Sequence, residues 1–314
     1  MSDPLRPDDL VFPKLKKAGK KMPKEEFICE EKLDGESLML IKGGAWGRRI
    51  SEVTGHRENK WDQLPWWIQQ KAQPEVLVHG ELYVTGGVAS DVKSAMKEGR
   101  ETDWKGELAQ RLQFVAYNLP YHDGGPIEHR AKLKDMDFDV PRVLMLRDFE
   151  AGHWALTQHW KQFSTPTMLG IVPEWLIEIA KREKIEGWVL KEIYTAAPWW
   201  KLRVTWTYDC VVMGTKDGTG MNFGDVGSLL VGMFTKVSET EPIALLEEVA
   251  SVGGMTEAER DWMTEHRDEL EGRVCEVEAN GVCSRGRLHH PRFVRWREDK
   301  PANECTSEQL ETKR

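Results

Sequence analysis

The chain lacks several features that would assign it to a specialised class of protein. No apolar run approaches the ~20 residues needed to span a bilayer, and the N-terminus MSDPLRPDDL has neither the basic nor the apolar region of a secretory signal. The sequence contains no CxxC pair, no internal repeat and no low-complexity tract. The odd set of Cys29, Cys210, Cys275, Cys283 and Cys305 argues against a disulfide framework or a structural zinc. These absences predict a cytoplasmic protein with reduced thiols and no membrane contact.

The composition is that of an ordinary globular protein with unevenly placed charge. The 314 residues are 40% hydrophobic and 31% charged, which allows a real core and two domains of ~100–200 residues. A net charge of −8 argues at first against a polyanionic partner. However, residues 238–280 carry thirteen acids and three arginines, whereas residues 14–24 hold six lysines and residues 285–300 six basic residues against two acids. We expect the acidic segment to face solvent and the basic strips to face phosphates.

Short runs rich in β-branched and apolar residues predict many strands. The predicted strands are 27–32, 37–41, 76–84, 112–118, 187–193, 209–213, 228–234, 274–279 and 293–297. Helices are predicted over 174–183, where apolar residues recur at i, i+4, and over 256–270, which opens with a capping box. This mixture predicts an α+β protein. A glycine-rich turn at 216–220 and the patterns around it predict domains of residues 1–205 and 206–314.

The segment FICEEKLDGE places Lys32 at the end of an apolar strand, directly before an Asp-Gly turn. A lone lysine at a hairpin is ordinarily solvated. The alternative is a nucleophile, which must be partly deprotonated by nearby cations. Such a site would also need carboxylates for a metal and cations for a phosphate.

Later segments supply groups of these types within strands or at strand ends. They are Glu81 in VHGELYV, Tyr117 in LQFVAYNL, Glu186 and Lys191 in IEGWVLK, and Lys201 and Arg203 in WWKLR. Each taken alone is explained as an edge-strand charge, a core ring or a solvated face. Lys201 and Arg203, spaced by two, are predicted to share one face of a strand.

Taken in order, KLDG, GELYV, FVAYNL, EGWVLK, WWKLR and the basic HPRFVRWREDK resemble the motifs of ATP-dependent DNA ligases, within the covalent nucleotidyltransferase superfamily. The resemblance covers about residues 12–300 and is most similar to the compact ligases of small tailed phages. It implies a nucleotidyltransferase domain, with ATP-grasp-like antiparallel sheets and helices, followed by an OB-fold β-barrel.

The resemblance also implies roles for individual residues. Lys32 would attack the α-phosphate of ATP and hold AMP, Glu30 would recognise the adenine amino group, and Tyr117 would stack on the base. Glu81 and Glu186 would hold Mg²⁺ (Mn²⁺ is possible) or the ribose. The cations that would neutralise or orient phosphates are Lys191, Lys201 and Arg203, together with Arg295, Arg297 and Lys300 at the C-terminal motif. Such a site needs many cations because phosphoryl transfer depends on positioning and charge stabilisation.

One position departs from the ligase pattern. Ligases of this kind carry an arginine two residues after the glycine of KxDG, and this chain has Ser37 there. Arg48 or Arg49 stands where the next motif supplies an arginine, and Arg49 is favoured.

The implied activity is the sealing of 5′-phosphate/3′-hydroxyl nicks in duplex DNA, in DNA replication or repair. We expect a monomer in the cytosol of a bacterium or of a phage-infected host. The alternatives are an RNA ligase, an mRNA-capping guanylyltransferase that uses GTP, and a non-enzymatic nucleic-acid clamp. The C-terminal motif favours the DNA ligase, and the intact lysine, glutamates and paired cations argue against a clamp.

Overall fold

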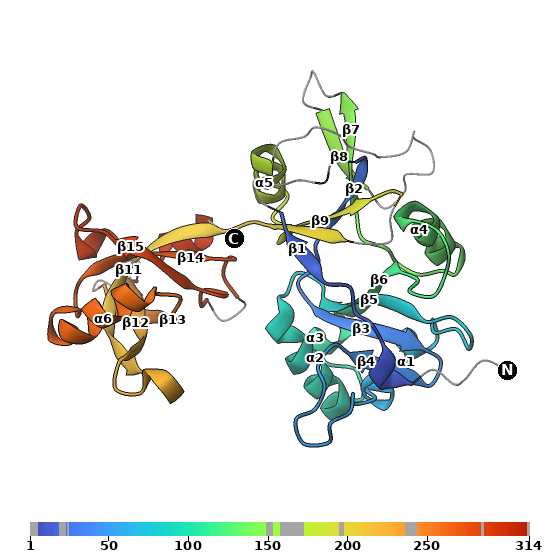
Figure 1. Ribbon diagram of the computed structural model, residues 1–314, viewed down its shortest axis with the longest axis horizontal. Coiled ribbons are helices and arrows are strands. Elements are labelled where there is room, and N and C mark those ends of the chain that lie inside the picture. Colours follow the sequence, from blue (N-terminus) through green and yellow to red (C-terminus); the bar gives the residue numbers. More distant parts are fainter. Residues whose placement is uncertain are drawn as a thin grey trace. The chain divides into compact units, whose positions relative to one another are not determined.

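The computed structural model describes residues 6–18, 23, 25–148, 153–157, 173–194, 198–235, 244–283 and 286–312. The chain divides into two compact units, Met1–Val204 and Thr205–Arg314, and most of their helices and strands are labelled in Figure 1. No helix in these described ranges is long and apolar enough to cross a membrane.

The first unit contains ten strands and five α-helices among its described residues. Its strands are β1 (Leu15–Lys17), β2 (Phe27–Glu31), β3 (Glu36–Ile41), β4 (Gly44–Gly47), β5 (Val78–Val84), β6 (Leu112–Asn118), β7 (Val143–Asp148), β8 (His153–Thr157), β9 (Gly187–Glu192) and β10 (Trp199–Arg203). Its helices are α1 (Trp66–Gln69), α2 (Ala89–Thr102), α3 (Glu107–Gln110), α4 (Pro126–Asp135) and α5 (Pro173–Arg182), with 3-10 turns η1 (Pro7–Asp9) and η2 (Trp61–Gln63).

These strands form two sheets. One has the order β1-β10-β9-β2-β7-β8 and the other the order β4-β3-β5-β6. All neighbours are antiparallel except β1 and β10, which run parallel. The first sheet joins strands from both ends of the unit, because β2 pairs with β9 along Phe27–Glu31. The lysine-bearing strand is therefore central in its sheet.

The core of the four-stranded sheet follows from the two-residue period of its strands. Leu38, Leu40 and Leu82 are buried on one face, in the same apolar cluster as Val92 and Met96 of α2. Helices α2 and α3 lie beside this sheet in Figure 1. The opposite face carries polar side chains and also Met39, which is buried in a second apolar cluster with Leu10 and Phe12.

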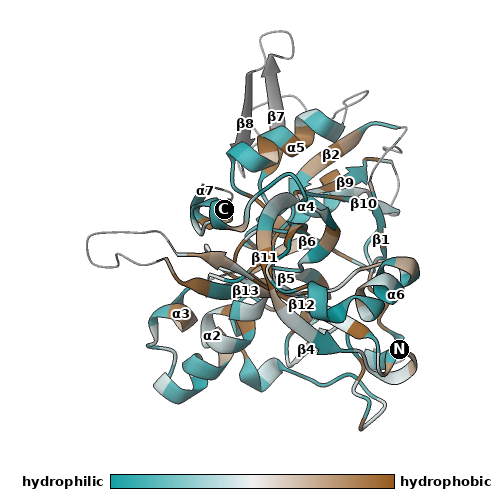
Figure 2. Ribbon diagram, turned by 90° about the vertical axis from the view of Figure 1, so that its left-hand side faces the viewer, coloured by the Kyte–Doolittle hydropathy of each residue, from teal (hydrophilic) through white to brown (hydrophobic). Residues whose placement is uncertain are grey.

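Helix α5 covers part of the six-stranded sheet. Leu176, Ile179 and Ala180 are buried, and the indole Nε1 of Trp188 on β9 donates to the Leu176 carbonyl at 2.7 Å. Figure 2 shows both brown and teal on α5, as expected of an amphipathic helix. Trp188 thus faces the helix, and its neighbour Val189 faces the other side of the sheet.

The second unit is one five-stranded antiparallel sheet with the order β13-β12-β11-β14-β15. The strands are β11 (Trp206–Asp217), β12 (Val226–Phe234), β13 (Leu246–Val252), β14 (Val274–Ala279) and β15 (Arg292–Trp296). The helices are α6 (Glu257–Glu265) and α7 (Glu308–Thr312), with 3-10 turns η4 (Gly220–Asn222), η5 (Arg267–Glu269) and η6 (Ala302–Glu304). A bridge between Gly253 and Arg292 connects the chain after β13 to the start of β15.

The prediction of a mixed α+β protein is confirmed. Each predicted strand is present, although the one at 209–213 extends over Trp206–Asp217. The capping box is formed, because the Glu259 amide donates to the Thr256 hydroxyl and Glu259 Oε2 accepts from the Thr256 amide. The helix predicted over 256–270 is shorter, because α6 ends at Glu265 and the 3-10 turn η5 follows it. The sequence reading missed the other described helices and strands, which are α1 to α4, α7, β1, β4, β7, β8 and β13. The polar side chains His129 and Arg130 make up much of the buried face of α4, so its amphipathic signal is weak.

Candidate active site

The pairing register determines which side chains share a face of the six-stranded sheet. Lys191 on β9 is opposite Ile28 on β2 and Trp199 on β10, and Lys201 is opposite Val189. Side chains directly opposite one another point to the same side. One face therefore carries Glu30, Lys191, Trp199, Lys201 and Arg203, together with Lys17 of β1, which is paired with Lys201.

The four-stranded sheet presents a second polar face. Ser37 is opposite Glu81, and the Tyr117 hydroxyl lies 3.4 Å from Glu81 Oε2. The two faces meet, since Lys191 Nζ donates to the Tyr117 carbonyl at 2.8 Å and the Tyr117 and Trp199 rings are 5.9 Å apart. The structure thus brings motif residues from both sheets into one site.

Lys32 lies at the centre of this site. Its backbone amide donates to the Gly187 carbonyl at 2.9 Å, which continues the β2–β9 ladder by one residue. Its ammonium contacts Glu186 Oε2, while Arg203 Nε lies 3.1 Å from the other oxygen of Glu186. The Lys32 side chain is 12% exposed and that of Glu186 is 7% exposed. Glu186 therefore holds the lysine in a fixed position with little competition from water.

Two motif glycines are required by close backbone approach. A Cβ on Gly35 would lie 2.3 Å from the Leu82 carbonyl oxygen. A Cβ on Gly187 would lie 2.1 Å from the Leu202 carbonyl, and Gly187 also has a φ of +144°, which favours glycine. The absence of a Cβ at these positions allows the chain entering β3 to approach β5, and β9 to approach β10.

Glu81 is the carboxylate best placed to gain a ligand. Burial, supported by the negative charge of Glu186, raises the pKa of Glu81 to about 7, although Lys32 and the Tyr117 hydroxyl act in the opposite direction. Burial likewise raises the pKa of Glu186. Carboxylates that are reluctant to ionise gain from a cation, and Mg²⁺ binds through one or two carboxylates plus substrate phosphates. The two carboxylates of Glu81 and Glu186 fit this mode of binding. A cluster of three or more His, Cys, Asp or Glu side chains, which could hold a metal without a substrate, does not occur among the described residues.

Ser37 belongs to a polar network with His79 and Tyr117. Ser37 Oγ lies 2.9 Å from His79 Nε2 and 3.3 Å from the Tyr117 hydroxyl, which is itself 3.0 Å from the same nitrogen. Burial, followed by the charges of Lys191 and Arg48, lowers the pKa of His79 to about 3. The imidazole is neutral near pH 7, so the network orients the Tyr117 ring without adding charge.

Glu30 and Lys191 form a buried ion pair. Lys191 Nζ lies 2.6 Å from Glu30 Oε2, and Arg130 Nη1 of α4 lies 3.3 Å from Glu30 Oε1. All three side chains are at most 3% exposed. Lys191, predicted to meet the phosphate, is thus bound to the residue predicted to recognise the base.

The remaining cations of the site are unequally placed. Lys201 is half-buried, and burial, followed by the charges of Arg203, Lys32 and Arg48, lowers its pKa. Arg48 stacks over the Phe12 ring at 5.9 Å. Arg49, which the sequence reading favoured, is 82% exposed and pairs with Glu52 at 3.3 Å. The charge of Arg48 acts on His79 and Lys201, so Arg48 is the arginine close to the site.

Three further predicted residues belong to the second unit. Arg297 Nη1 and Lys300 Nζ each lie 2.7 Å from an oxygen of Asp209. Arg297 also binds Asp299 at 2.8 Å, and this hydrogen bond contributes most to raising the pKa of Arg297. Arg295 pairs with Glu276 at 2.7 Å. These cations are held by carboxylates of their own unit.

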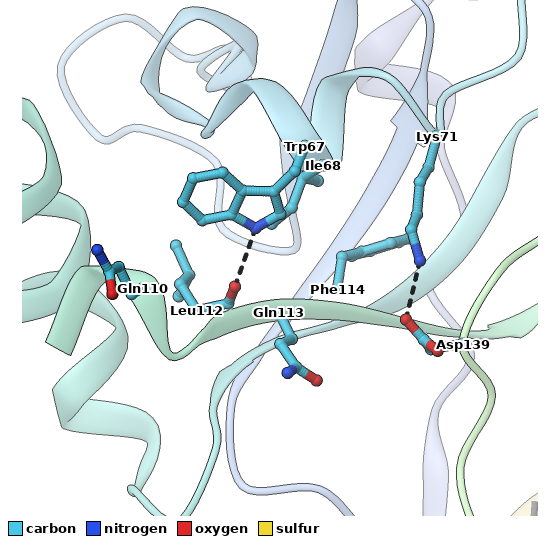
Figure 3. Close-up of a pocket in the computed structure, with 8 residues that line it drawn as sticks. All are labelled: Trp67, Ile68, Lys71, Gln110, Leu112, Gln113, Phe114 and Asp139. Carbon is cyan, nitrogen blue, oxygen red and sulfur yellow. Dashed lines mark hydrogen bonds and ion pairs between the residues drawn. The ribbon is translucent and has the colours of Figure 1, made fainter. Parts of the chain in front are cut away.

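A hollow of about 380 Å³ lies outside this site (Figure 3). It is lined by Trp67, Ile68, Lys71, Gln110, Leu112, Gln113, Phe114 and Asp139. The indole of Trp67 donates to the Leu112 carbonyl at 3.2 Å, and Lys71 pairs with Asp139 at 2.8 Å. None of the predicted site residues lines it.

Sequence reading missed Arg130, His79 and Lys17 as members of the site. Arg130 lies in an unpredicted helix, so no motif pointed to it. His79 directly precedes the Gly-Glu of GELYV and could have been found from the strand period, because it shares a face with Glu81. Lys17 belonged to a lysine run with no individual assignment; of that run, residues 19–22 and 24 lie outside the described residues.

Comparison with known proteins gives consistent results. No model of a known protein family matches the sequence. DNA ligase C1 of Mycolicibacterium smegmatis is 25% identical over 367 residues, an alignment that covers 99% of this chain and 96% of the relative. The solved structure of a Lig E DNA ligase matches with a TM-score of 0.56 and 17% identity, over 92% of this chain and all of that chain. The structure called Pmar-Lig_Pre matches with a TM-score of 0.57 and 16% identity, over 92% of this chain and 67% of that chain. The resemblance to DNA ligases that the six motifs predict is therefore confirmed.

Proposed function

We propose that this protein is an ATP-dependent DNA ligase that seals 5′-phosphate/3′-hydroxyl nicks in duplex DNA through a covalent lysyl-AMP intermediate. The observation that carries the proposal is the setting of Lys32. This lysine is largely buried and is held by Glu186, whose carboxylate also binds Arg203. The charges of Lys32 and Glu186 both act on the nearby carboxyl of Glu81. The likeness to DNA ligase C1 along nearly the whole chain supports the same activity.

In the first step, Lys32 Nζ would attack the α-phosphorus of ATP. A P–N bond forms, the bond from that phosphorus to the pyrophosphate oxygen breaks, and the nearest acceptor for the lysine proton is Glu186 Oε2. Lys201 and Arg203 share the Lys32 side of the sheet and would stabilise the negative charge that builds on the phosphate. AMP would then pass to the 5′-phosphate of the nick, and the 3′-hydroxyl would displace it.

The base and the sugar would lie beside the second sheet. The Tyr117 ring would stack on adenine, and the hydrogen bond of its hydroxyl to His79 Nε2 at 3.0 Å would hold the ring in place. Glu30 would accept a hydrogen bond from the adenine amino group. Glu81 and Glu186 are the carboxylates that would hold Mg²⁺, which would neutralise phosphate charge. Arg48, rather than Arg49, is the arginine we propose to reach the nucleotide, because its charge acts on His79 and Lys201.

The second unit is proposed to be an OB-fold barrel. Three features support this assignment: the order β13-β12-β11-β14-β15, the placement of α6 between β13 and β14, and the Gly253–Arg292 bridge that joins the two edges. Arg297 and Lys300 would orient pyrophosphate by exchanging Asp209 for phosphate oxygens. The exposed acids of β13 and α6 would face away from the duplex, because they would repel its phosphates. We propose a cytoplasmic monomer acting in replication or repair.

The test is covalent labelling. The protein is incubated with Mg²⁺ and ATP, GTP or NAD⁺ labelled in the phosphate adjoining the nucleoside, and the denatured protein is examined for a bound nucleotide. We expect a label from ATP that is absent in Lys32→Ala and unchanged in Lys71→Ala, a control lysine in the hollow of Figure 3. Nicked DNA and nicked RNA are then offered in parallel. No ATP label, a label in Lys32→Ala, or sealing of RNA alone would each overturn the proposal.

A further inference from the structure

A buried cluster of one carboxylate and two cations lies behind the candidate site. Glu30 of β2 is bound at Oε2 by Lys191 of β9 (2.6 Å) and at Oε1 by Arg130 of α4 (3.3 Å). Arg130 Nη2 also donates to the Pro141 carbonyl at 2.6 Å, and Lys191 Nζ donates to the Tyr117 carbonyl at 2.8 Å. The carboxylate is therefore held at both oxygens by cations that are themselves anchored to backbone.

Folding stability does not explain this cluster. Its formal charge is +1, and a buried charge without a counter-ion is unfavourable. Arg130 Nε has no hydrogen-bond partner within the described part of the chain, which adds a further cost. Lys191 alone already neutralises Glu30. The second cation adds no charge balance, but it fixes the orientation of the carboxylate.

The cluster adjoins the ring proposed to stack on the base. Lys191 Nζ lies 5.1 Å from the centre of the Tyr117 ring and 4.2 Å from that of Trp199. Each carboxylate oxygen has two lone pairs, so Glu30 can accept another hydrogen bond while bound to both cations. One lone pair remains on each oxygen, and both have fixed directions, because Arg130 and Lys191 hold the two oxygens from different elements.

We propose that Arg130 is a positioning residue for base selection, acting through Glu30 to favour adenine over guanine. This inference rests on the proposed function. Adenine carries an amino donor at position 6, where guanine carries a carbonyl acceptor. A fixed carboxylate oxygen accepts from the first and repels the second. Without Arg130, Glu30 is held at one oxygen only and can turn aside, which leaves the Lys191 ammonium accessible to the guanine carbonyl.

The experiment compares nucleotide use in Arg130→Met and Arg130→Lys. Arg130→Met leaves the neutral Glu30–Lys191 pair, so the fold has no unpaired buried charge to accommodate. For formation of the lysyl-nucleotide adduct, we expect the KM for ATP to rise about tenfold, which corresponds to about 1.4 kcal/mol. The kcat should stay within about twofold, because Lys32 and its partners are untouched, and the preference for ATP over GTP should fall by the same factor as KM rises. Arg130→Lys retains the charge but not the two-ended contact, so its loss of preference should be smaller, roughly threefold.

Arg142→Met is the matched control. Arg142 binds Glu31, the next residue of β2, at 2.6 and 3.0 Å, and Glu31 points to the other face of the sheet. This variant should keep both KM and nucleotide preference. A wild-type protein that ATP does not label would refute the proposed function itself. If the wild type is labelled but both Arg130 variants keep its nucleotide preference, or lose kcat at unchanged KM, the inference is overturned and the ligase assignment remains. Thermal unfolding of each variant confirms that it is folded.

Discussion

Glu81→Gln removes a carboxyl that the fold makes reluctant to ionise. Glu81 lies beside Glu186 and Tyr117, and burial, together with the charge of Glu186, raises its pKa from 4.5 to about 7. Glutamine has nearly the same shape and no charge. The variant therefore isolates the cost of ionising Glu81 within the folded protein.

The size of this cost follows from the two pKa values. One pKa unit corresponds to about 1.4 kcal/mol, so the shift amounts to about 3 kcal/mol, and about 2–3 kcal/mol when allowance is made for the partial exposure of Glu81. Because the folded-state pKa is raised, there is no penalty below pH 4.5, where the carboxyl is protonated in both states. The wild type loses stability relative to Glu81→Gln as the pH rises from 4.5 to 7, and the difference is constant above pH 7.

Urea unfolding between pH 5 and 8 in a chelator, followed by tryptophan fluorescence, measures this difference. Glu101→Gln, which removes an exposed carboxyl of α2, should follow the wild type at every pH. Adding Mg²⁺ at pH 8 should stabilise the wild type more than Glu81→Gln, since a ligand of the native state raises stability by mass action. A constant gap between wild type and Glu81→Gln across this pH range would refute the electrostatic account of the site.

Three further outcomes are expected. Arg48→Ala should raise the KM for ATP about tenfold, which is the lower range for a lost hydrogen bond to a charged group. Arg49→Ala should leave the adenylylation kinetics unchanged, and equal effects of the two substitutions would show that the arginines are misassigned. Gly35→Ala should destabilise the protein by about 1–3 kcal/mol or more, because its methyl group would overlap a carbonyl of β5, as measured by urea unfolding. Thr256→Ala should cost about 1 kcal/mol through loss of the α6 cap, and an unchanged midpoint for the second unit would contradict the role of that cap.

Much of the candidate site could be predicted from sequence because its residues stand at strand ends and on strand faces. Lys201 and Arg203 share a face as their spacing of two predicts, and Lys32 follows its strand directly. The period of two specifies a face for each strand, and the motif order suggests which faces belong together. The bounds of the strands that were predicted agree well with the structure, because their β-branched runs ended at clear turn signals, whereas β1, β4, β7, β8 and β13 were not predicted.

Other assignments depended on contacts between distant segments. Arg48 and Arg49 are adjacent, and tertiary contacts distinguish them, because Arg48 lies over the Phe12 ring and its charge acts on His79 and Lys201. Lys191 was assigned to the phosphate from its motif, whereas the pairing of β9 with β2 puts it against Glu30. Arg130 lies 100 residues from its partner Glu30, and no local pattern connects the two.

The sequence by itself determined the class of fold, and it indicated Lys32 as a candidate nucleophile together with a set of carboxylates and cations for the same site, because strand periodicity and turn residues act over a few positions. It also showed that the net charge of −8 conceals basic strips beside one acidic segment. Only the tertiary structure decided which charges meet. Burial and pairing across strands joined Glu186 to Lys32, raised the pKa of Glu81, and placed Arg130 behind Glu30. Electrostatic interactions of buried groups depend on distance in space and on exclusion of water, and neither quantity can be read from separation along the chain.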